Sequence, residues 1–151
     1  MAGQEDLPSL SALCVTVPGA AAAWESAVQR WGKLSLRQVL SPAIELATEG
    51  FPVAPGAAYL WRESEGLLRR AARGKDTPFL PGGRAPVAGE IFKNPDLAST
   101  FQRVSDEGAS KGFYQGPVAE SIVQALSERG EVCVGGFLGF GVSGVLKRTK
   151  S

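Results

Sequence analysis

The stretch VTVPGAAAAWESAVQRWGKLSLRQVLSPAIELATEGFPV, residues 15–53, decides the fold because it joins a strand-like end to two or three helices. Apolar side chains at Trp24, Ala27, Val28 and Trp31 recur at the i, i+3, i+4 and i+7 spacing of one helix face. Gly32 follows, and we expect it to end this helix in left-handed backbone. Residues 12–17, apolar and β-branched, predict one short strand whose pairing partners must come from elsewhere.

The signals for a second helix come directly after Gly32. Ser35 and Gln38 have the spacing of a capping box, in which each side chain binds the other residue's backbone N–H group. Pro42 lacks a backbone N–H group, so we expect this helix to stop or kink there, with Ser41-Pro42 starting a third helix. Gly50 is expected to close that third helix.

The rest of the chain is predicted to be mostly helical. Residues 55–73 predict an amphipathic helix that is interrupted or weakened near Gly66, with its arginines on a solvated face. Residues 74–90 are rich in glycine and proline and predict a loop with one tight turn. Asn94-Pro95-Asp96 predicts the start of a helix that extends to Gly108, and Pro117 that of a last helix ending near Gly130. The inward residues expected on these three helices are Tyr59, Leu60, Leu67, Leu68, Leu97, Phe101, Val104, Val118, Ile122, Ala125 and Leu126.

Composition excludes several classes of function. The chain has 151 residues, which is enough for one domain, and 16 basic and 15 acidic side chains give it a net charge of +1. This balance predicts no nucleic-acid partner and no anionic membrane surface. The chain contains no histidine, which removes Ser-His-Asp and Cys-His catalysis and histidine metal ligation. Cys14 and Cys133 stand far apart, so we expect two isolated buried thiols and neither a disulfide framework nor a zinc site.

Two long blocks resemble the large subunit of γ-glutamyltransferases, which are also called glutathione hydrolases. These blocks are VPGAAAAWESAVQRWGKLSLRQVLSPAIELATEGFPV, residues 17–53, and FLPGGRAPVAGEIFKNPDLASTFQRVSDEGASKGFYQGPVAESIVQAL, residues 79–126. The resemblance implies part of an N-terminal nucleophile hydrolase, an αββα sandwich in which this chain supplies a helical layer. We therefore expect a mainly α fold with one or two short strands. The domain predicted from the resemblance covers residues 1–130, with the similarity itself over residues 15–130, and residues 131–151 form a divergent glycine-rich tail.

The resemblance also implies a mechanism. Relatives release an N-terminal threonine by autocatalysis, and its hydroxyl attacks the γ-glutamyl carbonyl of glutathione while its own α-amine acts as the base. That threonine belongs to the small subunit, and none of the threonines of this chain lies in a context similar to the cleavage motif. They are Thr16, Thr48, Thr77, Thr100 and Thr149. Arg84 follows a glycine turn and is interpreted as a surface loop residue. No catalytic, cofactor-binding or metal-binding residue is therefore assigned, and no cofactor is expected.

The tail EVCVGGFLGFGVSGVLKRTKS, residues 131–151, departs from the family pattern. Gly139, Gly141 and Gly144 match GxGxxG, but too little sequence follows for a dinucleotide site. The apolar run at residues 132–146 is shorter than the roughly 20 residues of a membrane helix. We interpret the tail as a replaced C-terminus rather than a membrane anchor.

Two functions remain open. The chain is either part of the large subunit of a γ-glutamyltransferase, inactive alone, or a non-catalytic helical module that binds a partner such as the small subunit through exposed apolar faces. The first residues carry acids early and lack an apolar core, so no signal peptide is predicted and a cytoplasmic location is the default. The resemblance itself implies that full-length relatives are extracellular, membrane-anchored or periplasmic.

Overall fold

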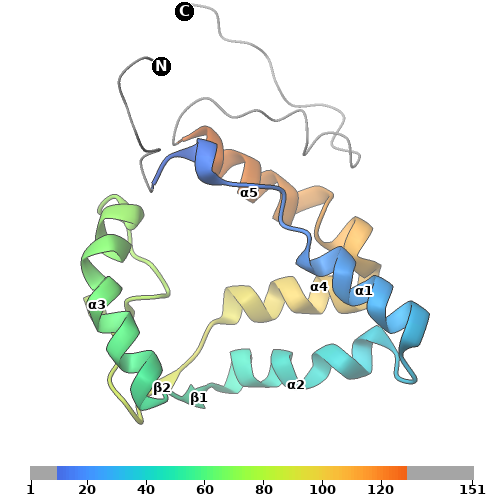
Figure 1. The fold of residues 1–151 in the computed structure, drawn as a ribbon, viewed down its shortest axis with the longest axis horizontal. Helices are drawn as coiled ribbons and strands as arrows, with labels where there is room; N and C mark the ends of the chain where they lie inside the picture. The colour runs from blue at the N-terminus through green and yellow to red at the C-terminus, as the bar shows by residue number, and fades with distance from the viewer. Residues whose placement is uncertain (1–9, 129–151) are drawn as a thin grey trace, which may run out of the picture. The chain divides into compact units, whose positions relative to one another are not determined.

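The computed structural model describes residues 10–128, with the side chain of Leu13 excepted, and its elements are mostly helical (Figure 1). By their contacts the residues form two compact units, one from residues up to Val39 and from Gln102 onward, the other from Leu40 to Phe101. In chain order the elements are η1 (Ala12–Cys14), α1 (Ala20–Trp31), α2 (Leu36–Glu49), β1 (Phe51–Pro52), α3 (Pro55–Ala72), η2 (Pro81–Gly83), β2 (Ile91–Phe92), α4 (Pro95–Gly112) and α5 (Gly116–Ser127). The expected mainly α architecture with one or two short strands is confirmed.

The first unit is held together by a small core of alanines and one tyrosine. Ala21 of α1 and Ala109 of α4 pack against the ring of Tyr114, and all three are at least 95% buried. The Tyr114 hydroxyl donates to the carbonyl of Pro18 at 2.7 Å and accepts from the N–H group of Ala22 at 3.3 Å. Because this phenol satisfies backbone groups on both sides of the α1 start, it fixes where that helix begins.

α4 contains a break that the predicted helix end at Gly108 anticipated. Gly108 has φ 76° and ψ 168°, a conformation that residues with a Cβ atom rarely adopt. The N–H group of Ala109, directly after the break, donates a hydrogen bond to the carboxylate of Glu25 on α1 at 3.2 Å. An ion pair between Arg37 in the first turn of α2 and Asp106 of α4 lies at the surface of the same unit.

The second unit is organised by a short antiparallel ribbon. β1 pairs with β2 with Phe51 opposite Phe92, and the pairing continues through Val53, whose N–H group binds the carbonyl of Glu90 at 2.9 Å. The buried ring of Phe92 packs edge to face against Trp61 of α3, with 4.7 Å between the ring centroids. These contacts fix α3 against the ribbon.

Asn94 is the buried polar residue that starts α4. Its side-chain oxygen accepts the N–H group of Leu97 at 3.1 Å, as the predicted N-cap requires, and its own N–H group binds the carbonyl of Ala47 at 2.9 Å. The end of α2 and the start of α4 are thereby joined.

The capping box at the start of α2 is confirmed. The N–H group of Ser35 donates to the Gln38 side chain at 2.9 Å, and the N–H group of Gln38 donates to the Ser35 hydroxyl at 3.3 Å. Gly50 ends α2 with φ 97°.

Several sequence predictions about element ends were wrong. Residues 12–17 form no strand: Ala12–Cys14 is a 3₁₀ turn, and within residues 10–128 the two strands are β1 and β2. Pro42 lies inside the continuous helix α2 and does not stop it, because burial of Leu40 and Ala47 on either side offsets the missing hydrogen bond. Gly66 likewise leaves α3 unbroken. Gly32 ends α1 in extended backbone with ψ 148°, and glycine is needed there because a Cβ would lie 2.5 Å from the Val28 carbonyl oxygen.

The expected inward faces were also partly wrong, because small side chains occupy the closest contacts. Val104 of α4 is fully buried and Phe101 half-buried, as predicted, but Leu97 is 40% exposed. Leu60 on α3 and Trp31 on α1 are more than 60% exposed. Residues 131–151, including Cys133 and the three tail glycines, lie outside the described residues.

Replacing Gly108 by alanine is expected to lower the free energy of unfolding by about 1–3 kcal/mol, because alanine is strained at this backbone conformation. The added Cβ would also lie 2.8 Å from the Glu25 carboxylate, which must then release the N–H group of Ala109. The matched control is Gly66→Ala in the middle of α3, where the Cβ meets only the tip of Arg70 at 3.9 Å. That change should stabilise the chain by about 0.5–1 kcal/mol. Chemical denaturation followed by circular dichroism measures both, and equal effects of the two substitutions would contradict the assignment of Gly108.

Candidate functional site

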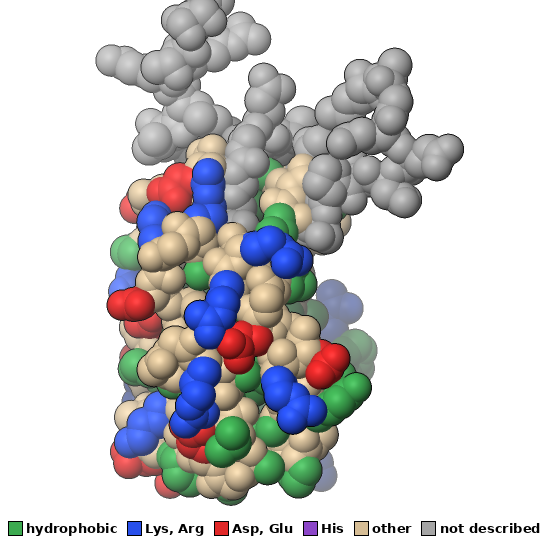
Figure 2. All heavy atoms as spheres, turned by 90° about the vertical axis from the view of Figure 1, so that its left-hand side faces the viewer, with side chains coloured by type: hydrophobic (Ala, Val, Ile, Leu, Met, Phe, Trp, Pro, Cys, Tyr) green, Lys and Arg blue, Asp and Glu red, His purple; other side chains and the backbone are tan. Residues whose placement is uncertain are grey.

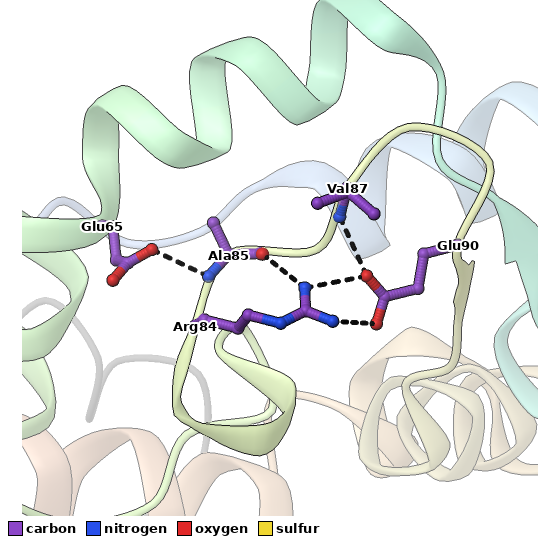
Figure 3. Close-up of polar contacts among 5 residues, drawn as sticks. All are labelled: Glu65, Arg84, Ala85, Val87 and Glu90. Atoms are coloured by element: carbon purple, nitrogen blue, oxygen red, sulfur yellow. Dashed lines mark hydrogen bonds and ion pairs between the residues drawn. The ribbon is translucent and has the colours of Figure 1, made fainter.

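The loop of residues 84–90 is held on α3 by one carboxylate (Figure 3). Glu65 projects from α3 toward the loop, and its Oε2 atom accepts the N–H group of Ala85 at 2.9 Å. Its Oε1 atom accepts Arg69 Nη2 at 2.6 Å, one helical turn further along α3. Glu65 therefore anchors the start of the loop through a backbone group, and any residue type at position 85 except proline can supply that group.

Arg84 closes the same loop on itself. Its guanidinium donates to both carboxylate oxygens of Glu90, at 2.9 and 3.3 Å, and to the carbonyl of Ala85 at 3.0 Å. Glu90 also accepts the N–H group of Val87 at 2.9 Å (Figure 3). This fork-to-fork geometry fixes both side chains in one orientation. Arg84 is a surface residue, as predicted, but its pairing with Glu90 was missed because a separation of six residues in an irregular loop follows no helix or strand period.

The surroundings of both carboxylates favour the charged form. The N–H group of Ala85, and then Arg69, lower the pKa of Glu65 below its ordinary value of 4.5. Arg84, and then the N–H group of Val87, lower the pKa of Glu90 in the same way. A general acid or base for neutral pH needs a raised carboxyl pKa, so these two groups are suited to anchoring the loop and not to proton transfer.

A groove of about 420 Å³ lies between the first half of α3 and this loop. Its lining is mostly apolar, with three charged side chains among ten residues. The residues that line it are Pro55, Ala58, Tyr59, Arg62, Glu65, Arg84, Ala85, Pro86, Val87 and Ala88. A concave apolar surface with a few charged groups is the usual form of a binding site.

None of the described threonines lines the groove. Thr48 and Thr100 lie inside α2 and α4, where their hydroxyls donate to the carbonyls of Ile44 and Asp96. The Thr77 hydroxyl accepts the N–H group of Phe79 in a turn, and Thr16 is exposed between η1 and α1. The structure therefore brings none of these four to the groove, and Thr149 lies outside the described residues.

Neither Cys14 nor the acidic side chains within residues 10–128 form a metal site. Cys14 is exposed, which corrects the expectation that it is buried: the turn that replaces the predicted strand leaves it at the surface. No three His, Cys, Asp or Glu side chains gather there as a metal-binding group. None of the helices in this part of the chain has the length and apolar character needed to span a membrane.

The arginines of α3 do not form a continuous basic surface. On the face of the molecule seen in Figure 2, basic and acidic side chains alternate, with hydrophobic side chains among them. Arg69 pairs with Glu65, and Arg62 lies 3.9 Å from Glu63. This distribution agrees with the predicted solvated helix face.

Replacing Arg84 by glutamine should raise the pKa of Glu90 toward 4.5 and leave the pKa of Glu65 low, because the largest contribution at Glu65 is the N–H group of Ala85. Carboxyl-carbon NMR titration of both side chains measures this. Because both values are lowered, their stabilising effect is complete above pH 4.5 and is lost as the pH falls through the folded-state values. Arg70→Gln is the control substitution on α3, and parallel rises at both glutamates would contradict the separate roles assigned here.

Comparison with known proteins identifies the family. The profile of the family described as Gamma-glutamyltranspeptidase matches residues 1–139. The chain is 35% identical over 116 residues to the glutathione hydrolase-like YwrD proenzyme of Bacillus subtilis. The aligned residues are 77% of this chain and 22% of that protein. It is 32% identical over 126 residues to glutathione hydrolase 3 of Arabidopsis thaliana, and these residues are 82% of this chain and 19% of that protein. The chain spans about a fifth of the length of these curated relatives.

Solved structures agree with the sequence comparison. The γ-glutamyltranspeptidase of Helicobacter pylori superposes with a TM-score of 0.73 at 29% identity, over 83% of this chain and 36% of that one. A cephalosporin acylase from Bacillus halodurans gives a TM-score of 0.69 at 31% identity, over 84% of this chain and 24% of that one. The family resemblance drawn from the two sequence blocks is confirmed, and this chain belongs to the gamma-glutamyltranspeptidase family.

Proposed function

We propose that this chain is a large-subunit segment of a γ-glutamyltransferase or glutathione hydrolase, in which it supplies part of a helical layer. In this proposal the assembled enzyme transfers or hydrolyses the γ-glutamyl group of glutathione, and the 151-residue chain has no such activity by itself. The names of its relatives and its likeness to a transpeptidase and an acylase support this assignment.

One observation carries the proposed lack of activity. The mechanism implied by the family uses a threonine hydroxyl together with the free α-amine of the same residue. A threonine gains that amine only when the peptide bond before it is cleaved, and none of Thr16, Thr48, Thr77, Thr100 and Thr149 lies in a context similar to the family's cleavage motif. Thr48 and Thr100 also lie within helices, where hydrogen-bonded backbone resists the rearrangement that would release an amine.

The groove supplies no substitute for this chemistry. Its three charged residues are Arg62, Glu65 and Arg84, and Glu65 is already engaged by a backbone N–H group and by Arg69. Tyr59 is the hydroxyl-bearing residue of the lining, and none of the three charged groups is a base for it at neutral pH.

The purified chain is expected to release no product from a γ-glutamyl anilide, because none of its threonines lies in a context similar to the cleavage motif that frees the amine. A Bacillus subtilis glutathione hydrolase, assayed in the same buffer, is the positive control. Turnover that co-purifies with the chain and is abolished by a γ-glutamyl-site inhibitor would refute the proposal. Single Thr→Ala variants at positions 16, 48, 77 and 100 would then identify the residue responsible.

A second function, a helical interaction module that binds the small subunit of such an enzyme, is favoured by exposed apolar side chains. Trp31 at the end of α1 is 77% exposed and Leu60 on α3 is 65% exposed. Large apolar side chains left in water mark binding surfaces when they occur together, and Leu34 is also more than half exposed. We propose these surfaces as the contacts with the small subunit.

Size-exclusion chromatography of the chain with the small subunit of a relative tests this second function. The mixture should elute as a complex, and Trp31→Ser should weaken the complex about tenfold or more, since aromatic anchors dominate interface energies. Lys33→Ser, at an exposed residue in the bend that follows α1, is the matched control. If the chain elutes as a stable monomer in the presence of the small subunit, the proposed interaction module is refuted.

A further inference from the structure

The groove beside α3 has one charged side chain that is not engaged in anchoring the loop. Glu65 is neutralised by Arg69, and Arg84 by Glu90. Arg62 is the remaining charged residue of the lining, and its side chain is 70% exposed. It forms a long, exposed ion pair with Glu63, whose Oε1 atom lies 3.9 Å from Nε, and this separation is beyond hydrogen-bonding distance. The lining therefore contains one guanidinium whose ion pair includes no hydrogen bond.

The position of Arg62 is set by a neighbouring ring. Its guanidinium carbon lies 5.7 Å from the centre of the Tyr59 ring, within the range of a cation–π contact. A contact of this kind holds the guanidinium near the ring while its N–H groups stay available, and a guanidinium fork matches the two oxygens of a carboxylate. The arrangement suits one carboxylate at the rim of the groove.

The walls beside Arg62 are apolar and preformed. Pro55 and Ala58 belong to the first turns of α3, and Pro86, Val87 and Ala88 belong to the loop. The loop is fixed at three backbone groups, by Glu65 at Ala85, by Arg84 at Ala85 and by Glu90 at Val87. Tyr59 and Val87 are 55% and 59% exposed, so a ligand that covers them removes apolar surface from water without having to order the loop first.

We propose that this groove binds a small carboxylate whose body is apolar, an alkyl or aryl carboxylate. The carboxylate pairs with Arg62, and the hydrocarbon body lies between Tyr59 and the exposed side chains of Val87 and Ala88. An inorganic phosphate has the charge for Arg62 but no surface for the walls, and a neutral amide has the surface but no charge. Binding of this ligand does not depend on the function proposed above.

The probe is 4-phenylbutyrate, titrated into the full ¹⁵N-labelled chain and followed by the amide resonances of Ala58, Val87 and Ala88. We expect saturable shifts at these amides. The affinity for 4-phenylbutyrate should fall about fivefold or more in Arg62→Gln, since a hydrogen bond to a charged group is lost. Arg70→Gln, a substitution on the same helix but outside the groove, should leave the affinity unchanged.

Two further titrations distinguish the chemistry recognised. 4-Phenylbutanamide and inorganic phosphate should each bind about fivefold or more weakly than 4-phenylbutyrate, because each lacks one of the two contacts. Equal binding of the amide, equal binding of phosphate, an unchanged affinity in Arg62→Gln, or the absence of saturable shifts with 4-phenylbutyrate would each overturn the proposal.

Discussion

Backbone N–H groups that leave the helices and strands of this chain must find acceptors, and distant side chains provide several of them. Glu65 accepts the N–H group of Ala85, 20 residues away, and Glu25 accepts that of Ala109, 84 residues away. The Tyr114 hydroxyl bridges Pro18 and Ala22 across more than 90 residues. An unpaired buried backbone group costs about 1–3 kcal/mol, so these contacts determine where the irregular segments lie.

This use of carboxylates bears on function. Glu65 and Glu90 are held in the charged form by N–H groups and arginines, and that form is what an anchor needs and what an acid catalyst must avoid. The chain contains no histidine, and none of its threonines lies in a context similar to the family's cleavage motif. Membership of the gamma-glutamyltranspeptidase family therefore fits a proposed contribution of shape and binding surface rather than of reacting groups.

The pattern of burial is consistent with that contribution. Alanines occupy the closest contacts in the first unit, where Ala21 and Ala109 lie against Tyr114, while the tryptophans of α1 are 40% and 77% exposed. Small side chains allow helices to approach closely, and the large ones are then left on the outer faces. In the second unit α3 has no fully buried residue, and it is fixed instead by Trp61 and by the anchor at Glu65.

The sequence by itself determined the helices, the capping box at Ser35 and Gln38, the N-cap at Asn94, the break at Gly108 and the family, because each depends on residues close together in the chain or on long blocks in register. It misjudged Pro42 and residues 12–17, since burial on both sides of a proline and the presence of a pairing strand are not local properties. Only the tertiary structure decided which helix faces are buried, where Arg84 finds its partner and how the groove beside α3 is formed. These features depend on contacts between segments whose spacing in the chain follows no period, so no local pattern records them.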